Sequence, residues 1–132
     1  SPYGFSKWAS GEYLKQFHAN YVNCIFPNIY GEGSRSVVDI FKGKNEVTIF
    51  GDGTHTRDYV HLDDIVDGLL EAKDWPKGDY YMGSGKSLSV LELAKGKKIN
   101  FASERKEAIE VIVPNTTPNW RIKINVFDYL NS

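Results

Sequence analysis

A tyrosine and a lysine lie four residues apart at the start of the sequence, in Ser1-Pro2-Tyr3-Gly4-Phe5-Ser6-Lys7. Side chains at positions i and i+4 share one face of a helix. A neighbouring ammonium group favours the phenolate and lowers a tyrosine pKa from its usual value near ~10. Tyr3 beside Lys7 could therefore take a proton from a hydroxyl group or return one to a carbonyl group. The same spacing is also common on solvent-exposed helices, where it has no catalytic meaning.

This chemistry requires a helix, and the flanking residues predict one from residue 2 to about residue 19. Ser1 can cap it, and Pro2 suits the first helical position, where no N–H is needed. Apolar side chains recur along it at near-helical spacing, and we expect them to be core. They are Phe5, Trp8, Ala9, Tyr13, Leu14 and Phe17.

Beyond this helix, the sequence predicts short strands alternating with short helices, which indicates an α/β fold. The expected strands span 21–26, 47–50, 57–61, 79–82 and 98–101. The expected helices span 34–42, 62–73, a short segment capped by Ser87 or Ser89, and 126–131. Gly51-Asp52-Gly53 is a strong turn signal and predicts a hairpin between the second and third strands. On the 62–73 helix we expect Ile65, Val66, Leu69 and Leu70 to be buried.

Composition excludes several classes of function. The 132 residues carry 16 Lys and Arg against 17 Asp and Glu, so nothing favours a nucleic acid or a membrane surface as partner. The single cysteine, Cys24, excludes an internal disulfide and suits a reducing, cytoplasmic location. Asp63 and Asp64 suit the first turn of a helix, and no third ligand follows at metal-binding spacing, so we expect no metal site.

Three segments together resemble the extended short-chain dehydrogenase/reductase family. The first is Ser1–Lys7, and the second is Pro27-Asn28-Ile29-Tyr30-Gly31-Glu32-Gly33. The third runs from Ile49 to Asp64 and contains Gly51-Asp52-Gly53 and Arg57-Asp58-Tyr59-Val60-His61. The members of this family with such segments are NAD-dependent nucleotide-sugar epimerases and dehydratases, typified by UDP-glucose 4-epimerase. The resemblance implies the C-terminal part of a Rossmann-type NAD-binding fold plus a smaller mixed α/β substrate-binding domain.

The resemblance also implies roles for individual residues. Tyr3 would be the catalytic base, and Lys7 would hold the nicotinamide ribose of NAD and keep Tyr3 acidic. Pro27 would lie near the nicotinamide. The nucleotide sugar is expected to be a UDP-sugar. The residues expected to bind it are Asn28, Thr48, Phe50, Arg57 and Arg105. Arg57 would clamp the diphosphate, because a guanidinium group can hold two phosphate oxygens at once.

The activity implied is epimerisation of a nucleotide sugar through a 4-keto intermediate. A 4,6-dehydratase of the same family is an alternative, and so is a nucleotide-sugar-binding or dimerising remnant without activity. The sequence holds no G-x-G-x-x-G turn, since Gly31-Glu32-Gly33 lacks the third glycine, so we expect the NAD-binding half to lie outside it. Residues 1–33 would then end the Rossmann-type domain, and residues 34–132 would form the interleaved sugar-binding domain. The helix over 2–19 would form a homodimer.

Overall fold

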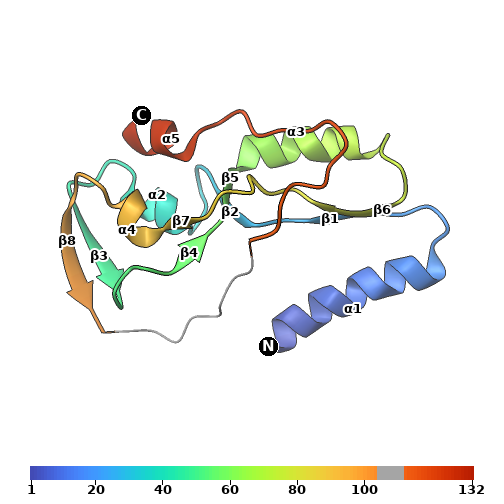
Figure 1. Cartoon of the computed structure of the whole chain (residues 1–132), viewed down its shortest axis with the longest axis horizontal. Coiled ribbons are helices and arrows are strands. Elements are labelled where there is room, and N and C mark those ends of the chain that lie inside the picture. Colours follow the sequence, from blue (N-terminus) through green and yellow to red (C-terminus); the bar gives the residue numbers. More distant parts are fainter. Residues whose placement is uncertain (104–111) are drawn as a thin grey trace.

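The computed structural model describes residues 1–103 and 112–132, so Arg105 lies outside the described residues. The helices are α1 (Pro2–Phe17), α2 (Val37–Phe41), α3 (Leu62–Ala72), α4 (Val90–Leu93) and α5 (Val126–Asn131). The strands are β1 (Val22–Ile25), β2 (Asn28–Tyr30), β3 (Glu46–Phe50), β4 (Thr56–Arg57), β5 (Tyr59–His61), β6 (Gly78–Tyr81), β7 (Leu88–Ser89) and β8 (Lys98–Ala102). Figure 1 shows their arrangement, and the α/β class is confirmed.

The strands pair over long distances in the sequence. Three pairs are parallel, β1 with β6, β2 with β5 and β3 with β8, and β4 pairs antiparallel with β7. The hairpin expected around Gly51-Asp52-Gly53 is therefore wrong. Strand β3, before the turn, pairs with β8, and strand β4, after the turn, pairs with β7. The loop expected at 27–33 is also wrong in part, because residues 28–30 form β2. A local turn signal cannot specify which distant strand will pair with β3. Glu46 of β3 lies opposite Lys98 of β8, which is 52 residues away in the sequence.

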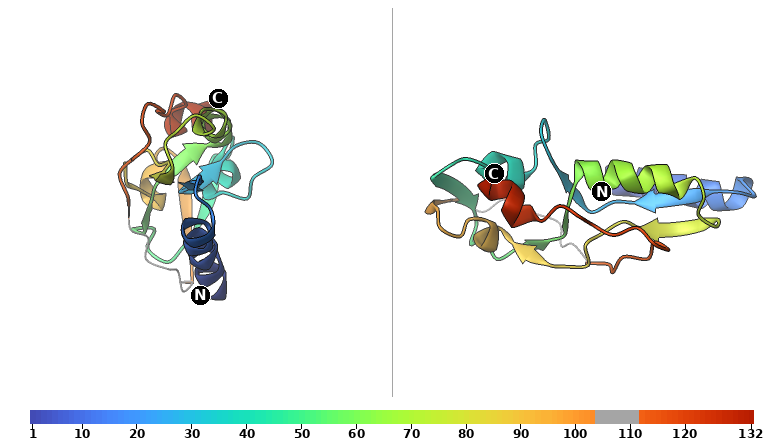
Figure 2. Two further views of the ribbon diagram at one scale, coloured as in Figure 1. Left: turned by 90° about the vertical axis from the view of Figure 1, so that its right-hand side faces the viewer. Right: turned by 90° about the horizontal axis from the view of Figure 1, so that it is seen from above.

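The helices divide between two ends of an elongated molecule. At one end, α1 and α3 lie on opposite sides of the β1–β6 pair, as Figures 1 and 2 show. At the other end, α2, α4 and α5 lie near the β3–β8 pair. Two groups of buried side chains form the core. The larger group is Tyr30, Val38, Phe41, Val47, Ile49, Tyr59, Leu93, Ala94, Val126 and Leu130. The smaller group is Val60, Ile65, Met82 and Trp120.

Helix α1 begins as expected, since the Ser1 side chain accepts a hydrogen bond from the Gly4 amide. The expectation that its aromatic side chains are core is wrong for this chain. Its exposed aromatic residues are Tyr3, Phe5, Trp8, Tyr13 and Phe17. Among the residues of α1, Gly11 alone is buried. A Cβ atom there would lie 3.0 Å from the side-chain nitrogen Nδ2 of Asn23. The apolar spacing thus predicted the helix but not which of its side chains are covered.

Helix α3 buries a different set of residues from the one expected. Ile65 is buried, but Val66, Leu69 and Leu70 are exposed, which corrects the expectation. The buried positions besides Ile65 are Asp64, Gly68 and Ala72. A Cβ atom on Gly68 would lie 2.2 Å from Met82 Cε and 2.8 Å from Trp120 Nε1, so the close approach of both side chains requires glycine.

Asp64 fastens the C-terminal segment to α3. Its side chain accepts hydrogen bonds from the backbone amides of Lys123 at 3.0 Å and Ile124 at 2.9 Å. Its carbonyl oxygen accepts one from Trp120 Nε1 at 2.8 Å. The buried carboxylate is therefore used to hold the chain, which is a structural rather than a metal-binding role.

Candidate functional site

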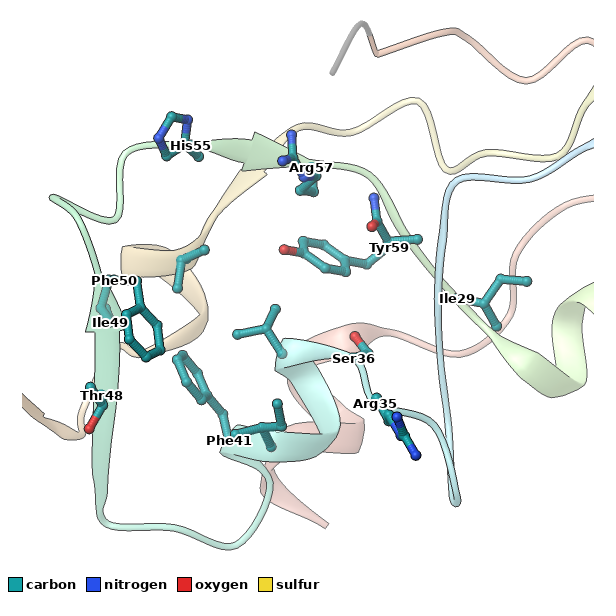
Figure 3. Close-up of a pocket in the computed structure, with 14 residues that line it drawn as sticks. Ile29, Arg35, Ser36, Phe41, Thr48, Ile49, Phe50, His55, Arg57 and Tyr59 are labelled. Carbon is teal, nitrogen blue, oxygen red and sulfur yellow. The ribbon is translucent and has the colours of Figure 1, made fainter. Parts of the chain in front are cut away.

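A cavity of about 440 Å³ opens between β3, the β4–β5 segment and α2, as Figure 3 shows. Asn28, Thr48, Phe50 and Arg57, all expected to bind the nucleotide sugar, line it together. They come from three different strands, β2, β3 and β4. The structure therefore brings these residues to one place, although they are up to 29 positions apart in the sequence (Asn28 to Arg57).

Strand β3 presents two of these side chains by simple alternation. Val47 and Ile49 are buried in the larger core group, and Thr48 and Phe50 alternate with them along the strand. Ile49 also lines the cavity, so the cavity borders the core at this strand. In Figure 3 the Phe50 ring lies near that of Phe41 from α2, and the Tyr59 ring projects into the same space. The aromatic rings and the Thr48 hydroxyl give a flat, partly polar wall, which suits a heterocyclic base.

The charge of this cavity is positive. Arg57 and Arg35 line it, and no carboxylate is found among the described residues that do so. Arg35 lies on the loop before α2, across the cavity from Arg57 (Figure 3). A cavity with guanidinium groups and no acidic side chain favours an anionic ligand such as a phosphate ester.

Asp58 fixes Arg57 beside Asn28. The buried Asp58 carboxylate accepts hydrogen bonds from the amides of Ser84 at 3.2 Å and Gly85 at 3.0 Å, and from the Ser84 hydroxyl. Its backbone oxygen accepts the Asn28 amide at 3.1 Å and the Asn28 side-chain nitrogen at 3.4 Å. The amides of the glycine-rich turn at 83–85 are thus taken up by a carboxylate of the chain itself, whereas the amides of a phosphate loop face a bound phosphate.

A second cavity, of about 520 Å³, lies next to the first and shares Asn28 with it. Tyr3 and Pro27, both expected near the nicotinamide, line it. Its other walls are mostly apolar or aromatic, formed by Ile25, Phe26, Tyr81, Ile112 and Val113 with Asp58 and Gly83. Lys7 is not among the described residues that line this cavity.

Tyr3 and Lys7 share one face of α1. The Lys7 ammonium lies 5.4 Å from the centroid of the Tyr3 ring, and the Tyr3 side chain is 73% exposed. The phenol is therefore not enclosed in an apolar interior, and it stands at the rim of a cavity with a cation beside it. This arrangement permits proton transfer to or from a ligand in the second cavity.

Arg35, His55 and Tyr59 are cavity residues that the sequence did not single out as binding residues; His55 had been expected to be a turn residue. Arg35 follows Gly33-Ser34 in a loop without regular spacing, so no periodic signal marks it. Tyr59 lies two positions after Arg57, and alternation along an extended chain could have placed both on one side. The position of His55 depends on the 51–55 turn, whose route is set by the pairing of β4 with β7.

Other candidate chemistry is not supported. His61 accepts a hydrogen bond from the Asp63 amide through Nδ1 at 3.1 Å and so caps α3. Across residues 1–103 and 112–132, no three His, Cys, Asp or Glu side chains gather closely enough to hold a metal ion. No helix in the same ranges is long and apolar enough to cross a membrane. Burial raises the pKa of the Cys24 thiol, which disfavours a nucleophilic role.

Comparison with known proteins supports the nucleotide-sugar interpretation. Residues 1–83 match the model of the NAD dependent epimerase/dehydratase family. The chain is 37% identical over 106 residues to a putative UDP-glucose 4-epimerase of Methanocaldococcus jannaschii, an alignment that covers 70% of this chain and 35% of the relative. It is also 37% identical over 108 residues to the UDP-glucose 4-epimerase of Mycolicibacterium smegmatis, covering 70% of this chain and 34% of the relative.

Solved structures agree on the fold. The UDP-glucose 4-epimerase of Thermotoga maritima with UDP-glucose matches with a TM-score of 0.75 and 25% identity, over 94% of this chain and 48% of that one. An NAD-dependent NDP-hexosamine 5,6-dehydratase, TunA, matches with a TM-score of 0.73 at 23% identity, over 94% of this chain and 48% of that one, which shows the fold alone. The chain thus spans about a third of the length of the relatives it matches and about half of these structures.

Proposed function

The chain belongs to the NAD-dependent epimerase/dehydratase family, and on this premise we propose that it forms the nucleotide-sugar-binding part of an epimerase acting on a UDP-hexose. The 440 Å³ cavity takes the nucleotide diphosphate, and the adjacent 520 Å³ cavity takes the sugar and the nicotinamide. The observation that carries this proposal is the shared wall at Asn28, which makes the two cavities neighbours. A ligand with a base, a diphosphate and a sugar has the length and polarity to occupy both.

The residues of the first cavity bind the nucleotide in this proposal. Phe50 and Thr48 hold the base by ring contact and hydrogen bonding, and Arg57 neutralises the diphosphate. Asn28 donates to the sugar or its phosphate at the point where the cavities meet. Arg105 is a further proposed ligand of the diphosphate and lies outside the described residues.

The second cavity fits the nicotinamide end of NAD. Pro27 and the apolar side chains of Ile25 and Phe26 give a surface for a flat ring, and Tyr3 stands at the rim. NAD, when bound, accepts the hydride from the sugar and returns it. Tyr3 takes the proton from the sugar hydroxyl as the carbonyl forms, and it returns the proton to the carbonyl oxygen when the hydride comes back to the opposite face of the carbonyl carbon. The proton and the hydride therefore both balance. Lys7 stabilises the phenolate and binds the nicotinamide ribose.

The same proposal extends to the arrangement of the molecule. Residues 1–33 complete the cofactor-binding domain, and residues 34–132 form the sugar-binding domain. The interleaving is supported by the pairing of β1, in the first range, with β6, in the second. The aromatic face of α1 forms a homodimer, which its exposed rings support. The enzyme acts in the cytoplasm, which the single free cysteine supports.

Isothermal titration of the 132-residue chain with UDP-glucose tests the proposal. We expect binding by the native chain, and we expect Arg57→Ala to weaken it by ~1.5–3 kcal/mol, as for loss of a hydrogen bond to a charged group. Arg121→Ala is the matched control, because Arg121 is an exposed arginine that lines neither cavity. Equal affinities in the Arg57 and Arg121 variants would refute the diphosphate role.

A second candidate is a nucleotide-sugar-binding chain without turnover of its own. It is favoured because the proposed nucleotide ligands gather in the 440 Å³ cavity, whereas Lys7 is not among the described residues that line the 520 Å³ cavity. Titration with NAD separates the two. Binding of UDP-glucose without NAD supports the second candidate, whereas interconversion of UDP-glucose and UDP-galactose on adding NAD supports the epimerase. Formation of a 4-keto-6-deoxy sugar would support a 4,6-dehydratase instead.

A further inference from the structure

The loop over residues 31–36 forms one wall of the 440 Å³ cavity through Arg35 and Ser36. The Asp39 carboxylate holds this loop from outside it. Both oxygens of Asp39, on α2, accept the Gly31 amide at 3.2 Å, and one accepts the Ser34 hydroxyl. The Ser34 hydroxyl oxygen in turn accepts the Ser36 amide at 3.1 Å. The position of the wall therefore depends on where Asp39 points.

Asp39 is oriented from the far end of the sequence. The Tyr129 hydroxyl on α5 donates a hydrogen bond to Asp39 Oδ1 at 2.7 Å. The Tyr129 ring is itself fixed, since it lies 5.2 Å from the Tyr30 ring and 5.0 Å from the His61 ring, centroid to centroid. The Lys42 ammonium lies 3.8 Å from the ring centroid on another side, within cation–π range.

A continuous hydrogen-bonded path thus runs from α5 to the cavity: Tyr129, Asp39, Ser34, Ser36. We propose that Tyr129 is a positioning residue that, through Asp39, fixes the 31–36 loop and so sets the place of Arg35 against the anionic part of the ligand. This inference rests on the proposed function for its ligand. It assigns to the C-terminal helix a part in substrate affinity, although α5 carries none of the residues that line that cavity.

Replacement of Tyr129 by phenylalanine removes the donor and leaves the ring contacts. Tyr80→Phe is the matched control, because Tyr80 also donates a hydrogen bond at 2.7 Å, to the Pro76 carbonyl, and lines neither cavity. The first measurement is amide hydrogen exchange of the ligand-free 132-residue chain, followed by NMR. In Tyr129→Phe we expect the Gly31 and Ser36 amides to exchange about tenfold faster, while the strand amides of β1 and β6 keep their native rates. In Tyr80→Phe we expect no change at Gly31.

The second measurement is the dissociation constant for UDP-glucose, which we expect to rise several-fold in Tyr129→Phe and not in Tyr80→Phe. Adding Asp39→Asn to the Tyr129→Phe variant should raise the dissociation constant by a smaller factor than Asp39→Asn raises it in the native chain. The reason is that the two residues act on one path. An unchanged exchange rate at Gly31, or a uniform rise throughout the chain, would overturn the inference. Faster exchange at Gly31 with an unchanged dissociation constant would also overturn it and leave the proposed function standing. If the native chain does not bind UDP-glucose, the proposed function fails, whereas exchange at Gly31 still decides whether Tyr129 fixes the loop.

Discussion

The chemistry assigned to this chain depends on a phenol at the rim of a cavity with a cation against its ring. The sequence alone predicted that Tyr3 and Lys7 share a helical face, because the spacing of four residues is sufficient for that. It could not predict that Tyr3 would meet Pro27 and Asn28 at one cavity, since this requires β1 to lie beside α1. The family resemblance supplied that expectation. The proton-transfer role itself remains a prediction.

Tyr3→Phe in the complete enzyme tests that role. Loss of the hydroxyl removes the proton acceptor but leaves the ring and the cavity wall, so we expect turnover to fall by at least ~10²-fold. UDP-glucose affinity should change little, because the proposed nucleotide ligands lie in the other cavity. Steady-state kinetics and titration measure the two quantities separately. Comparable turnover in the variant would remove Tyr3 as the base.

Asp39 gives a prediction for the dependence of stability on pH. Burial alone would raise its pKa, but hydrogen bonds from Ser34, Tyr129 and Gly31 outweigh burial and hold the pKa below its usual value. The unfolded state therefore binds the proton more tightly. The stabilisation is present above the unfolded pKa, near ~3.9, and is lost as pH falls through the lower, folded pKa.

We expect Asp39→Asn to flatten the fall in unfolding free energy between neutral and strongly acidic pH, measured by urea denaturation at several pH values. Asp74→Asn is the control, because Asp74 is an exposed carboxylate with a long contact to Lys73. A native-like acid slope in Asp39→Asn would show that this carboxylate does not contribute. Because Asp39 accepts the Tyr129 hydroxyl, the same hydrogen bond raises the pKa of Tyr129 to about 12.

Single helices were easier to predict than their surroundings. The bounds of α1, α3 and α5 agree with the expected ranges to within about two residues, because caps and apolar spacing are local signals. The residues that α3 buries were mostly mispredicted, because Val66, Leu69 and Leu70 face outward. The helix instead packs through Gly68, where Met82 and Trp120 approach closely. Such a contact depends on segments that follow much later in the sequence.

Gly68→Ala tests this packing. The added methyl group would displace Met82 and Trp120, and overpacking of this kind costs about 1–3 kcal/mol, which exceeds the gain of up to ~1 kcal/mol from better helix propensity. Loss of stability should appear as a lower urea midpoint. Leu70→Ala on the same helix is the control, since Leu70 is exposed and its change should stay within ~0.5 kcal/mol. A stabilised Gly68→Ala variant would contradict the described packing.

On the scale of the whole molecule, α1 exposes a series of large aromatic side chains. Four aromatic side chains besides Tyr3 are exposed along it in the single chain, and the proposed dimer would cover them. They are Phe5, Trp8, Tyr13 and Phe17. We expect the native chain to sediment as a dimer at micromolar concentration and Trp8→Asp to shift it toward the monomer. Leu70→Asp places the same charge on the exposed face of α3 and should leave the sedimentation unchanged. Equal behaviour of the two variants would remove α1 as the interface.

The pairing of the strands also has a consequence for how the chain acquires its structure. β1 cannot pair until residues 78–81 have been synthesised, and β3 cannot pair until residues 98–102 have been synthesised. The two intervals in which a strand lacks its partner overlap. At ~5–20 residues per second of synthesis, several seconds pass in which neither strand has its partner. Non-local parallel pairing also slows folding. The nascent chain therefore carries unpaired, half-apolar strand edges until residues 98–102 have been synthesised, and its yield in a cell should depend on holdase chaperones more than on its final stability.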